Sequence, residues 1–184
     1  GDCTMSTLYV DNLEPNLGSQ VEIPDLKPLA GSVVQVVQAT STTPLTLTAG
    51  GIVWTNAGAA LNITPTSSSN KILVLNSATG IVSQSTSGSL SLRLVRNLND
   101  GNGDTVTDAH RSRQGYQASG QSYIPINWDI NYLDSPNTTN QVTYRIQIAQ
   151  EQSGNLRYND TDSSSGYGSR TWSRSMLIGL EIAQ

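Results

Sequence analysis

This sequence contains no phenylalanine, one cysteine and one histidine, and charged residues make up only 13% of its 184 positions. Cys3 alone cannot form a disulfide within the chain, and His110 alone cannot build a zinc cluster of His and Cys ligands. Such sparse charge is unusual for an intracellular helical protein. It favours a β-rich protein that works outside a cell or on a particle. The length favours one domain whose core is large enough to be stable without a disulfide or a structural metal.

The same absences argue against several partners. The net charge is -4 and the arginines are scattered between positions 93 and 174, so we expect no nucleic-acid binding. No apolar run approaches the roughly 20 residues of a membrane span, and the first thirty residues lack a signal-peptide pattern. We therefore expect no membrane partner, and either release by cell lysis or a role inside the cell. No residue set indicates a cofactor.

What the chain has instead is a succession of strands. Met176, Ile178, Leu180 and Ile182 alternate almost to the carboxyl end, which predicts a final strand with one apolar face that closes a packed domain with the chain's own end. Further strands are predicted at Val33 to Ala39, Ala59 to Thr64, Lys71 to Leu75, Leu90 to Val95 and Val142 to Ile148. The continuous apolar run at 71–75 is typical of a strand covered on both faces.

Polar turn segments separate these strands, at 64–69, 99–104, 134–140 and 162–169, and no window shows helical periodicity. About seven to nine strands predict an all-β fold, an antiparallel jelly-roll-like β-sandwich over residues 31–184. Trp54 and Trp128 fall among strand residues and are expected in the core.

Residues 1–30 are predicted to form an extended N-terminal arm. The segment is rich in proline and its apolar groups are too few to bury a core unaided. An arm of this kind gains burial by packing on neighbouring chains, so we expect it to anchor the protein or support a trimer; a disordered tether is the alternative. The apolar side chains available for anchoring are Tyr9, Val10, Leu13, Val21 and Ile23.

An ordered set of short segments carries a resemblance to a known family. The segments are Gly31 to Gln38, Ser69 to Val74, Leu92 to Arg96, Tyr132 to Pro136, Val142 to Gln147 and Leu180 to Gln184, with Tyr9 to Pro15 and Gly18 to Val21 in the arm. Together they resemble a β-sandwich domain of virion structural proteins from tailed marine and cyanobacterial phages. The resemblance implies a virion protein, usually trimeric, of the capsid-decoration, head-fibre or tail-fibre type.

The length of the chain helps to choose among these types. A tail fibre needs a long shaft, whereas this chain has a short arm and one globular domain. We therefore expect a non-enzymatic trimeric capsid decoration (cement) or short head-fibre protein on the virion surface, made in the host cytoplasm and released by lysis. Its partners would be two further copies, the major capsid protein or another virion protein. The alternative is a tail-fibre or tail-tip protein that binds a host-surface glycan.

Catalysis finds little support in the sequence. A Ser-His-Asp triad would have to use His110, which lies in a polar stretch expected to be a solvated loop, and no Gly-x-Ser-x-Gly turn is present. Glycoside cleavage needs only two carboxylates at a suitable distance. No spacing identifies such a pair among the acids Asp129, Asp134, Asp160 and Asp162.

Two local motifs are candidates for binding. Asp100, Asn102 and Asp104 could offer oxygens to calcium, but the EF-hand spacing fails, and Asp-Gly followed by Asn-Gly favours a hairpin turn. An aromatic and basic cluster in a Gly/Ser-rich segment could stack and hydrogen-bond a sugar ring, although Trp172 could equally cap the last strand. The members of that cluster are Tyr167, Arg170, Trp172 and Arg174.

Overall fold

The computed structural model describes residues 28–48, 51–83, 90–101, 103–112, 123–150, 155–159 and 174–184. Over these ranges the chain contains strands and loops and no helix. The strands are β1 (Val33–Ser41), β2 (Leu45–Leu47), β3 (Thr55–Ile63), β4 (Lys71–Ser83), β5 (Leu90–Asn97), β6 (Asp104–Ser112), β7 (Tyr123–Asp134), β8 (Val142–Gln150), β9 (Asn155–Tyr158) and β10 (Ser175–Ile182).

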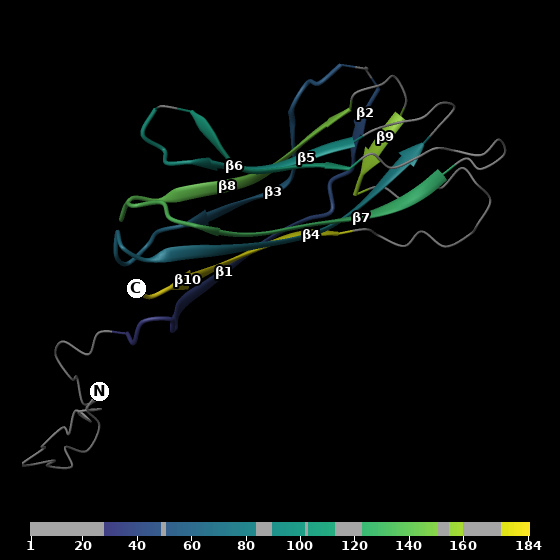
Figure 1. The fold of residues 1–184 in the computed structure, drawn as a ribbon. Coiled ribbons are helices and arrows are strands. Elements are labelled where there is room, and N and C mark those ends of the chain that lie inside the picture. The colour runs from purple at the N-terminus through teal and green to yellow at the C-terminus, as the bar shows by residue number, and fades with distance from the viewer. Residues whose placement is uncertain are drawn as a thin grey trace, which may run out of the picture.

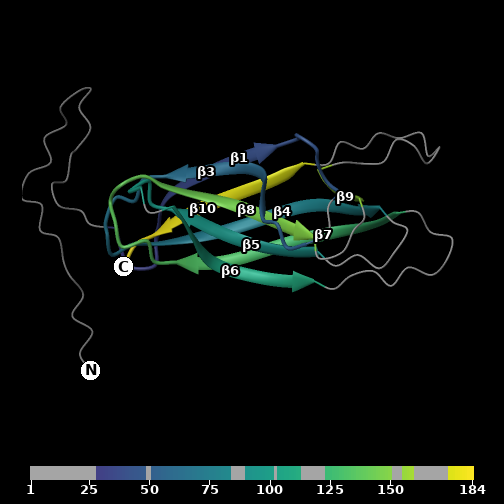
Figure 2. The same cartoon turned by 90° about the horizontal axis from the view of Figure 1, so that it is seen from above.

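The strands form two antiparallel sheets that pack face to face (Figures 1 and 2). In one sheet β1, β10, β4 and β7 lie side by side. The short β9 pairs with the second half of β4, and β2 pairs with β9. The other sheet has the order β3-β8-β5-β6. If β2 and β9 are set aside, the first long strand pairs with the last, the second with the seventh, the third with the sixth and the fourth with the fifth. This nested pairing defines a jelly roll.

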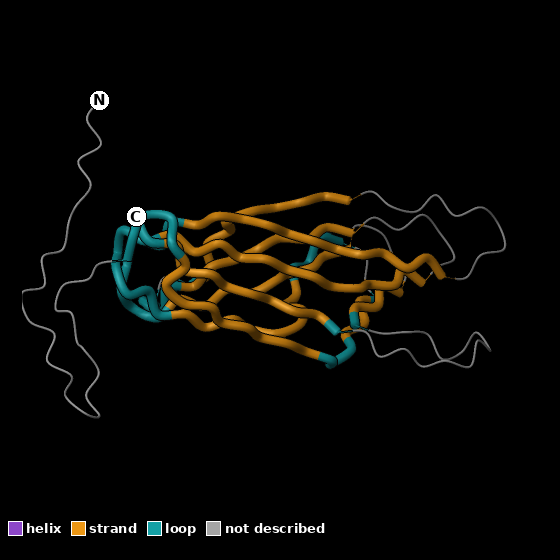
Figure 3. Tube along the Cα trace, turned by 90° about the horizontal axis from the view of Figure 1, so that it is seen from below, coloured by secondary structure: helices purple, strands orange, loops and turns teal. Residues whose placement is uncertain are grey.

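Period-two alternation places one side of each strand in the core. In β8 the side chains of Val142, Tyr144, Ile146 and Ile148 point inward and are almost completely buried, as the alternation predicts. They meet Leu61 and Ile63 of β3, Leu92 and Leu94 of β5, and Ile72, Val74, Ile130 and Leu177 of the opposite sheet. The strands run along the long axis of the sandwich, and the described loops at the end that holds the C-terminus close it (Figure 3).

The final strand is where the prediction and the structure differ most. The residues that face the core are Ser175, Leu177, Gly179, Glu181 and Ala183, whereas the predicted apolar face, Met176, Ile178, Leu180 and Ile182, lies half-buried on the outer side of the sheet. The inward position 179 is a glycine, and a Cβ there would lie 2.7 Å from Leu61 Cδ2 of the opposing sheet. The interior of β10 is therefore made of small residues, one leucine and a carboxylate.

Three smaller predictions also need correction. The described strands number ten rather than seven to nine, since the short β2 and β9 have too few residues to show alternation. His110 lies within β6, paired with Leu92, and not in a loop. Trp54 precedes β3 and is half-buried instead of fully in the core, with the Arg93 guanidinium carbon 4.2 Å from its ring centroid. Trp128 belongs to β7, and its side chain lies outside the described residues.

Candidate functional site

Glu181 is a fully buried carboxylate at the end of the sandwich that holds the C-terminus. Its Oε1 accepts hydrogen bonds from the backbone N and the Oγ1 of Thr66, at 2.7 and 2.8 Å, and from Asn70 Nδ2 at 2.6 Å. Its Oε2 accepts from Gln35 Nε2 at 2.5 Å. Burial pushes the pKa of Glu181 up, but these donors together outweigh it and hold the pKa below its ordinary range. The cluster ties β1, β10 and the 64–70 loop together.

A second buried carboxylate, Asp134 at the end of β7, joins the two sheets. Arg96 Nη1 of β5 donates to its Oδ1 and Oδ2 at 2.7 and 2.8 Å, and Tyr144 OH of β8 donates to Oδ2 at 2.6 Å. Burial and then the hydrogen bond to Asp134 raise the pKa of Tyr144 far above its usual value, so the phenol stays protonated. Both partners come from the sheet opposite β7, so this group connects the layers.

These two carboxylates lie in the same row of one sheet, separated by Ile72, which pairs with both Glu181 and Asp134. Two strand spacings place their Cα atoms about 10 Å apart. Each carboxylate is nevertheless enclosed by its own donors and screened by an apolar side chain, so the pair does not form an open glycosidase-like site. Asp129 lies exposed on β7, and Asp160 and Asp162 lie outside the described residues.

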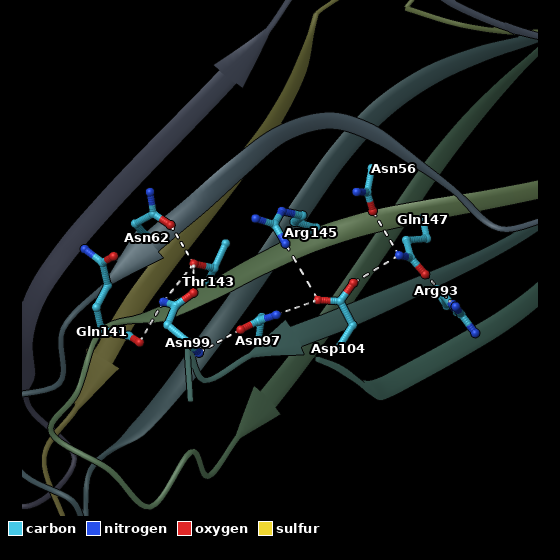
Figure 4. A network of polar contacts seen from close by, with 10 residues as sticks. All are labelled: Asn56, Asn62, Arg93, Asn97, Asn99, Asp104, Gln141, Thr143, Arg145 and Gln147. Atoms are coloured by element: carbon cyan, nitrogen blue, oxygen red, sulfur yellow. Dashed lines mark hydrogen bonds and ion pairs between the residues drawn. The ribbon is translucent and has the colours of Figure 1, made fainter. Parts of the chain in front are cut away.

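The outer face of the β3-β8-β5-β6 sheet carries a polar network (Figure 4). Gln147 of β8 bonds Asn56 and Arg93 on either side, and Arg145 lies 3.6 Å from Asp104. On the same face, at the left in Figure 4, Thr143 donates to Asn62 Oδ1, and Asn99 Nδ2 donates to the Gln141 carbonyl. The amide, guanidinium and carboxylate groups hold one another in place, and the half-buried Trp54 ring stacks beside Arg93 at one border.

The calcium motif is part of this network. Asp104 begins β6, and its Oδ1 accepts from Asn97 at 3.1 Å while its Oδ2 accepts from Gln147 at 3.3 Å. β5 and β6 pair as a hairpin around this segment, with positive φ angles at Asn99, Gly101 and Gly103. Asn102 lies outside the described residues, and the described ones contain no group of three or more His, Cys, Asp or Glu side chains placed to hold a metal. The described backbone of this segment therefore belongs to a hairpin, the alternative that the sequence favoured over a calcium loop.

The predicted glycan and arm residues are mostly not placed by the structure. Tyr167, Arg170 and Trp172 lie outside the described residues, and Arg174 is exposed just before β10. The arm residues Tyr9, Val10, Leu13, Val21 and Ile23 also lie outside the described ranges. The calcium, glycan and anchoring roles all remain predictions. In the described ranges no helix has the length and apolarity to cross a membrane.

The outer face of the β1-β10-β4-β7 sheet is aliphatic, in contrast to the polar outer face of the other sheet. One row runs across all four strands and consists of Val36, Leu180, Leu73 and Leu133. At its two ends Val36 is 61% exposed and Leu133 is 49% exposed. Ile178 and Leu75 form the centre of the next row, which ends in Gln38 and Asn131, and Val33 and Ile182 lie beside Lys71 in the row on the other side. We call the eight aliphatic residues of these rows the aliphatic face; no described strand lies over it (Figure 1).

Sequence reasoning missed both buried carboxylates and this face. Glu181 stands at a polar position of an alternating strand, which is normally the solvent side, and its donors lie more than 100 positions away in the sequence. The one available indication was the continuous apolar run at 71–75, which predicts cover on both sides of β4.

No family model matches this chain, and no curated protein matches it. Among solved structures, Eiger TNF from S. frugiperda is 10% identical over 81% of this chain and 94% of that chain, with a TM-score of 0.42. The infectious bursal disease virus Gx strain structure is 13% identical over 91% of this chain, with a TM-score of 0.43, and the VP2 subviral particle of that virus is 13% identical over 96%, with a TM-score of 0.39. The chain spans less than half of either viral chain. Similarity this weak carries no inference about function. The chain is a jelly-roll β-sandwich, a class that the strand pairing defines by itself.

Proposed function

We propose that this chain is a non-enzymatic structural protein of a tailed-phage virion, a homotrimeric capsid-decoration or short head-fibre protein attached by its N-terminal arm, residues 1–30. The aliphatic face carries the proposal. A row of four aliphatic side chains across a sheet, 61% exposed at one end and 49% at the other, favours a partner surface, as in a building block of an assembly.

The polar clusters support the part of the proposal that makes the protein non-enzymatic. The two buried carboxylates, Glu181 and Asp134, bind donors from their own chain and stabilise the fold. The acids and amides of the opposite outer face bind one another. A nucleophile with an adjacent base, which covalent catalysis requires, is not formed by these groups.

The copy number of the protein in purified virions tests the location. Quantitative mass spectrometry against the major capsid protein should give hundreds of copies per particle if the chain decorates the capsid. A few copies to a few dozen would place it in the tail or neck and overturn the decoration proposal. Absence from purified particles would overturn the virion role altogether.

The alternative, a tail-tip protein that binds a glycan, is favoured by one observation. Arg93, Gln147 and Asn56 offer donors and acceptors on a flat face beside the half-buried Trp54 ring, which is the chemistry that sugar hydroxyls and sugar rings require. A glycan array separates the two possible sites. Binding that is lost in Arg93→Ala would assign it to this face, whereas loss in Trp172→Ala would assign it to the 160–174 segment.

A further inference from the structure

We infer that the aliphatic face is the surface through which copies of this chain associate, with the strands running roughly along the symmetry axis. The inference rests on the homotrimer in the proposed function and names the surface that forms it.

The size of the face suits the apolar centre of an interface. Strands lie about 4.8 Å apart and side chains on one side of a strand lie about 6.6 Å apart, so the eight aliphatic positions cover roughly 250 Å². Gln38, Asn131 and Lys71 occupy the remaining positions of the same rows. A standard interface buries about 800 Å² per partner, so the adjacent strand edges and polar side chains must supply the rest of the contact.

The sequence of β4 shows that its second face is built for cover. Ile72 and Val74 point into the core and are fully buried, while Leu73 and Leu75 point outward and are only half-buried. A strand with one solvated side normally alternates apolar and polar residues, as β8 does with Tyr144, Arg145 and Ile146. Four consecutive aliphatic residues, Ile72 to Leu75, therefore match a strand with protein on both sides, and the described part of the chain covers only one of them.

The shape of the face selects a second copy as the occupant. The aliphatic row extends from one edge strand to the other, a width of about 19 Å, which one extended segment such as the arm could not cover along the strands. Equivalent faces of further copies can cover it, because copies related by an axis along the strands turn the same rows toward one another. Each copy provides a face of equal size. Lys71 and Asp129 lie at opposite borders, so no charge enters the central row.

A threefold arrangement brings like rows together. Rotation about an axis along the strands keeps each row at its own height, so Val36 on β1 meets Leu133 on β7 in the neighbouring copy; β1 and β7 are edge strands among the described strands of this sheet. Leu180 and Leu73, in the middle of the row, then face the axis. Contact of this kind also covers the two edges of the sheet, which would otherwise invite unspecific strand pairing.

Sedimentation velocity on the full chain tests the surface. Val36→Glu places one charge per copy in the contact, and the matched control Ala60→Glu adds the same charge at an exposed position on the other sheet, opposite Arg145. We expect an oligomer for the wild type and for Ala60→Glu. For Val36→Glu we expect dissociation to monomers, with association weakened about 100-fold or more, because each new carboxylate would be buried without a partner against Leu133 of the neighbouring copy.

Disulfide cross-linking provides a second measurement should Val36→Glu fail to fold by circular dichroism. In a Cys3→Ser background, Val36→Cys with Leu133→Cys should give covalent oligomers up to trimer on oxidation, and Ala60→Cys should not. A wild-type oligomer that persists in folded Val36→Glu, or that gives no cross-link, overturns this surface and leaves the homotrimer standing. A monomeric wild type overturns the homotrimer and this inference together.

Discussion

Replacement of Glu181 by glutamine should destabilise the protein by about 3 kcal/mol at neutral pH. The carboxylate is 0% exposed and accepts four hydrogen bonds from Thr66, Asn70 and Gln35. Hydrogen bonds to a charged group contribute about 1.5–3 kcal/mol each, against about 0.5–1.5 kcal/mol for neutral ones. The variant keeps its shape but loses the charge from each bond. It also introduces an N–H group opposite donors, and Gln35 cannot turn to accept because its Nε2 also donates to the Thr64 carbonyl.

The pH dependence of this loss has a definite sign. The pKa of Glu181 is lowered in the folded state, so its stabilising contribution is fully present above the ordinary glutamate pKa of about 4.3 and disappears as the pH falls through the folded value. The difference between wild type and Glu181→Gln should therefore be largest near pH 7 and shrink in acid.

Urea unfolding followed by tryptophan fluorescence measures both effects. A loss of about 3 kcal/mol corresponds to a drop of roughly 6–12 °C in Tm for a chain of this size. Asp129→Asn is the control, since this acid lies exposed on the outer side of β7 and its loss should cost less than about 0.5 kcal/mol. A Glu181→Gln protein within about 1 kcal/mol of wild type, which is about the error of the measurement, or a difference that does not change with pH, would refute the reasoning.

Three further outcomes are expected. Tyr144→Phe removes one of the donors to Asp134 and should lower the free energy of unfolding by about 2 kcal/mol, measured in the same assay. Gly58→Ala should cost about 2–4 kcal/mol, because Gly58 has a φ of 76° and the new Cβ would lie 2.7 Å from Ser175 Oγ; a stable variant would contradict this packing. Chelation with EDTA should leave Tm unchanged, since Asp104 already binds side chains of its own chain, and a clear drop would restore the calcium hypothesis.

The sequence contained enough to predict the all-β class and several strands. In β8 and β5 the alternation has a clear polar side, so burial of Tyr144 and Leu92 follows from local pattern alone. The final strand could not be oriented in this way. Its inward face depends on donors for Glu181 that come from β1 and the 64–70 loop, 146 and 115 positions away. A period-two pattern gives two faces and no information on which one finds such partners.

The candidate surfaces were less accessible to prediction for a related reason. Hydrophobic periodicity assigns apolar side chains to the core of one chain, and the aliphatic face is apolar without belonging to that core. Leu180 and Ile178 therefore indicated the interior, although they lie outside it. Polar alternation on β8 likewise predicted a solvated face, yet Gln147 and Thr143 are buried by their neighbours in the network. Both errors come from assuming that each face is either core or water.

Residues 31 and 32, where the predicted arm joins the sandwich, lie close to the Glu181 cluster. The root of the arm is fixed by two backbone hydrogen bonds, from Gly31 N to the Ala183 carbonyl at 2.8 Å and from Ala183 N to the Ser32 carbonyl at 3.0 Å. Two residues before Ala183, β10 carries Glu181, which accepts hydrogen bonds from Gln35 of β1 and Thr66 of the 64–70 loop. A pull on the predicted arm would thus act on β1 and β10, the strands that supply five of the eight residues of the aliphatic face. Loosening at Glu181 should therefore weaken association as well as folding.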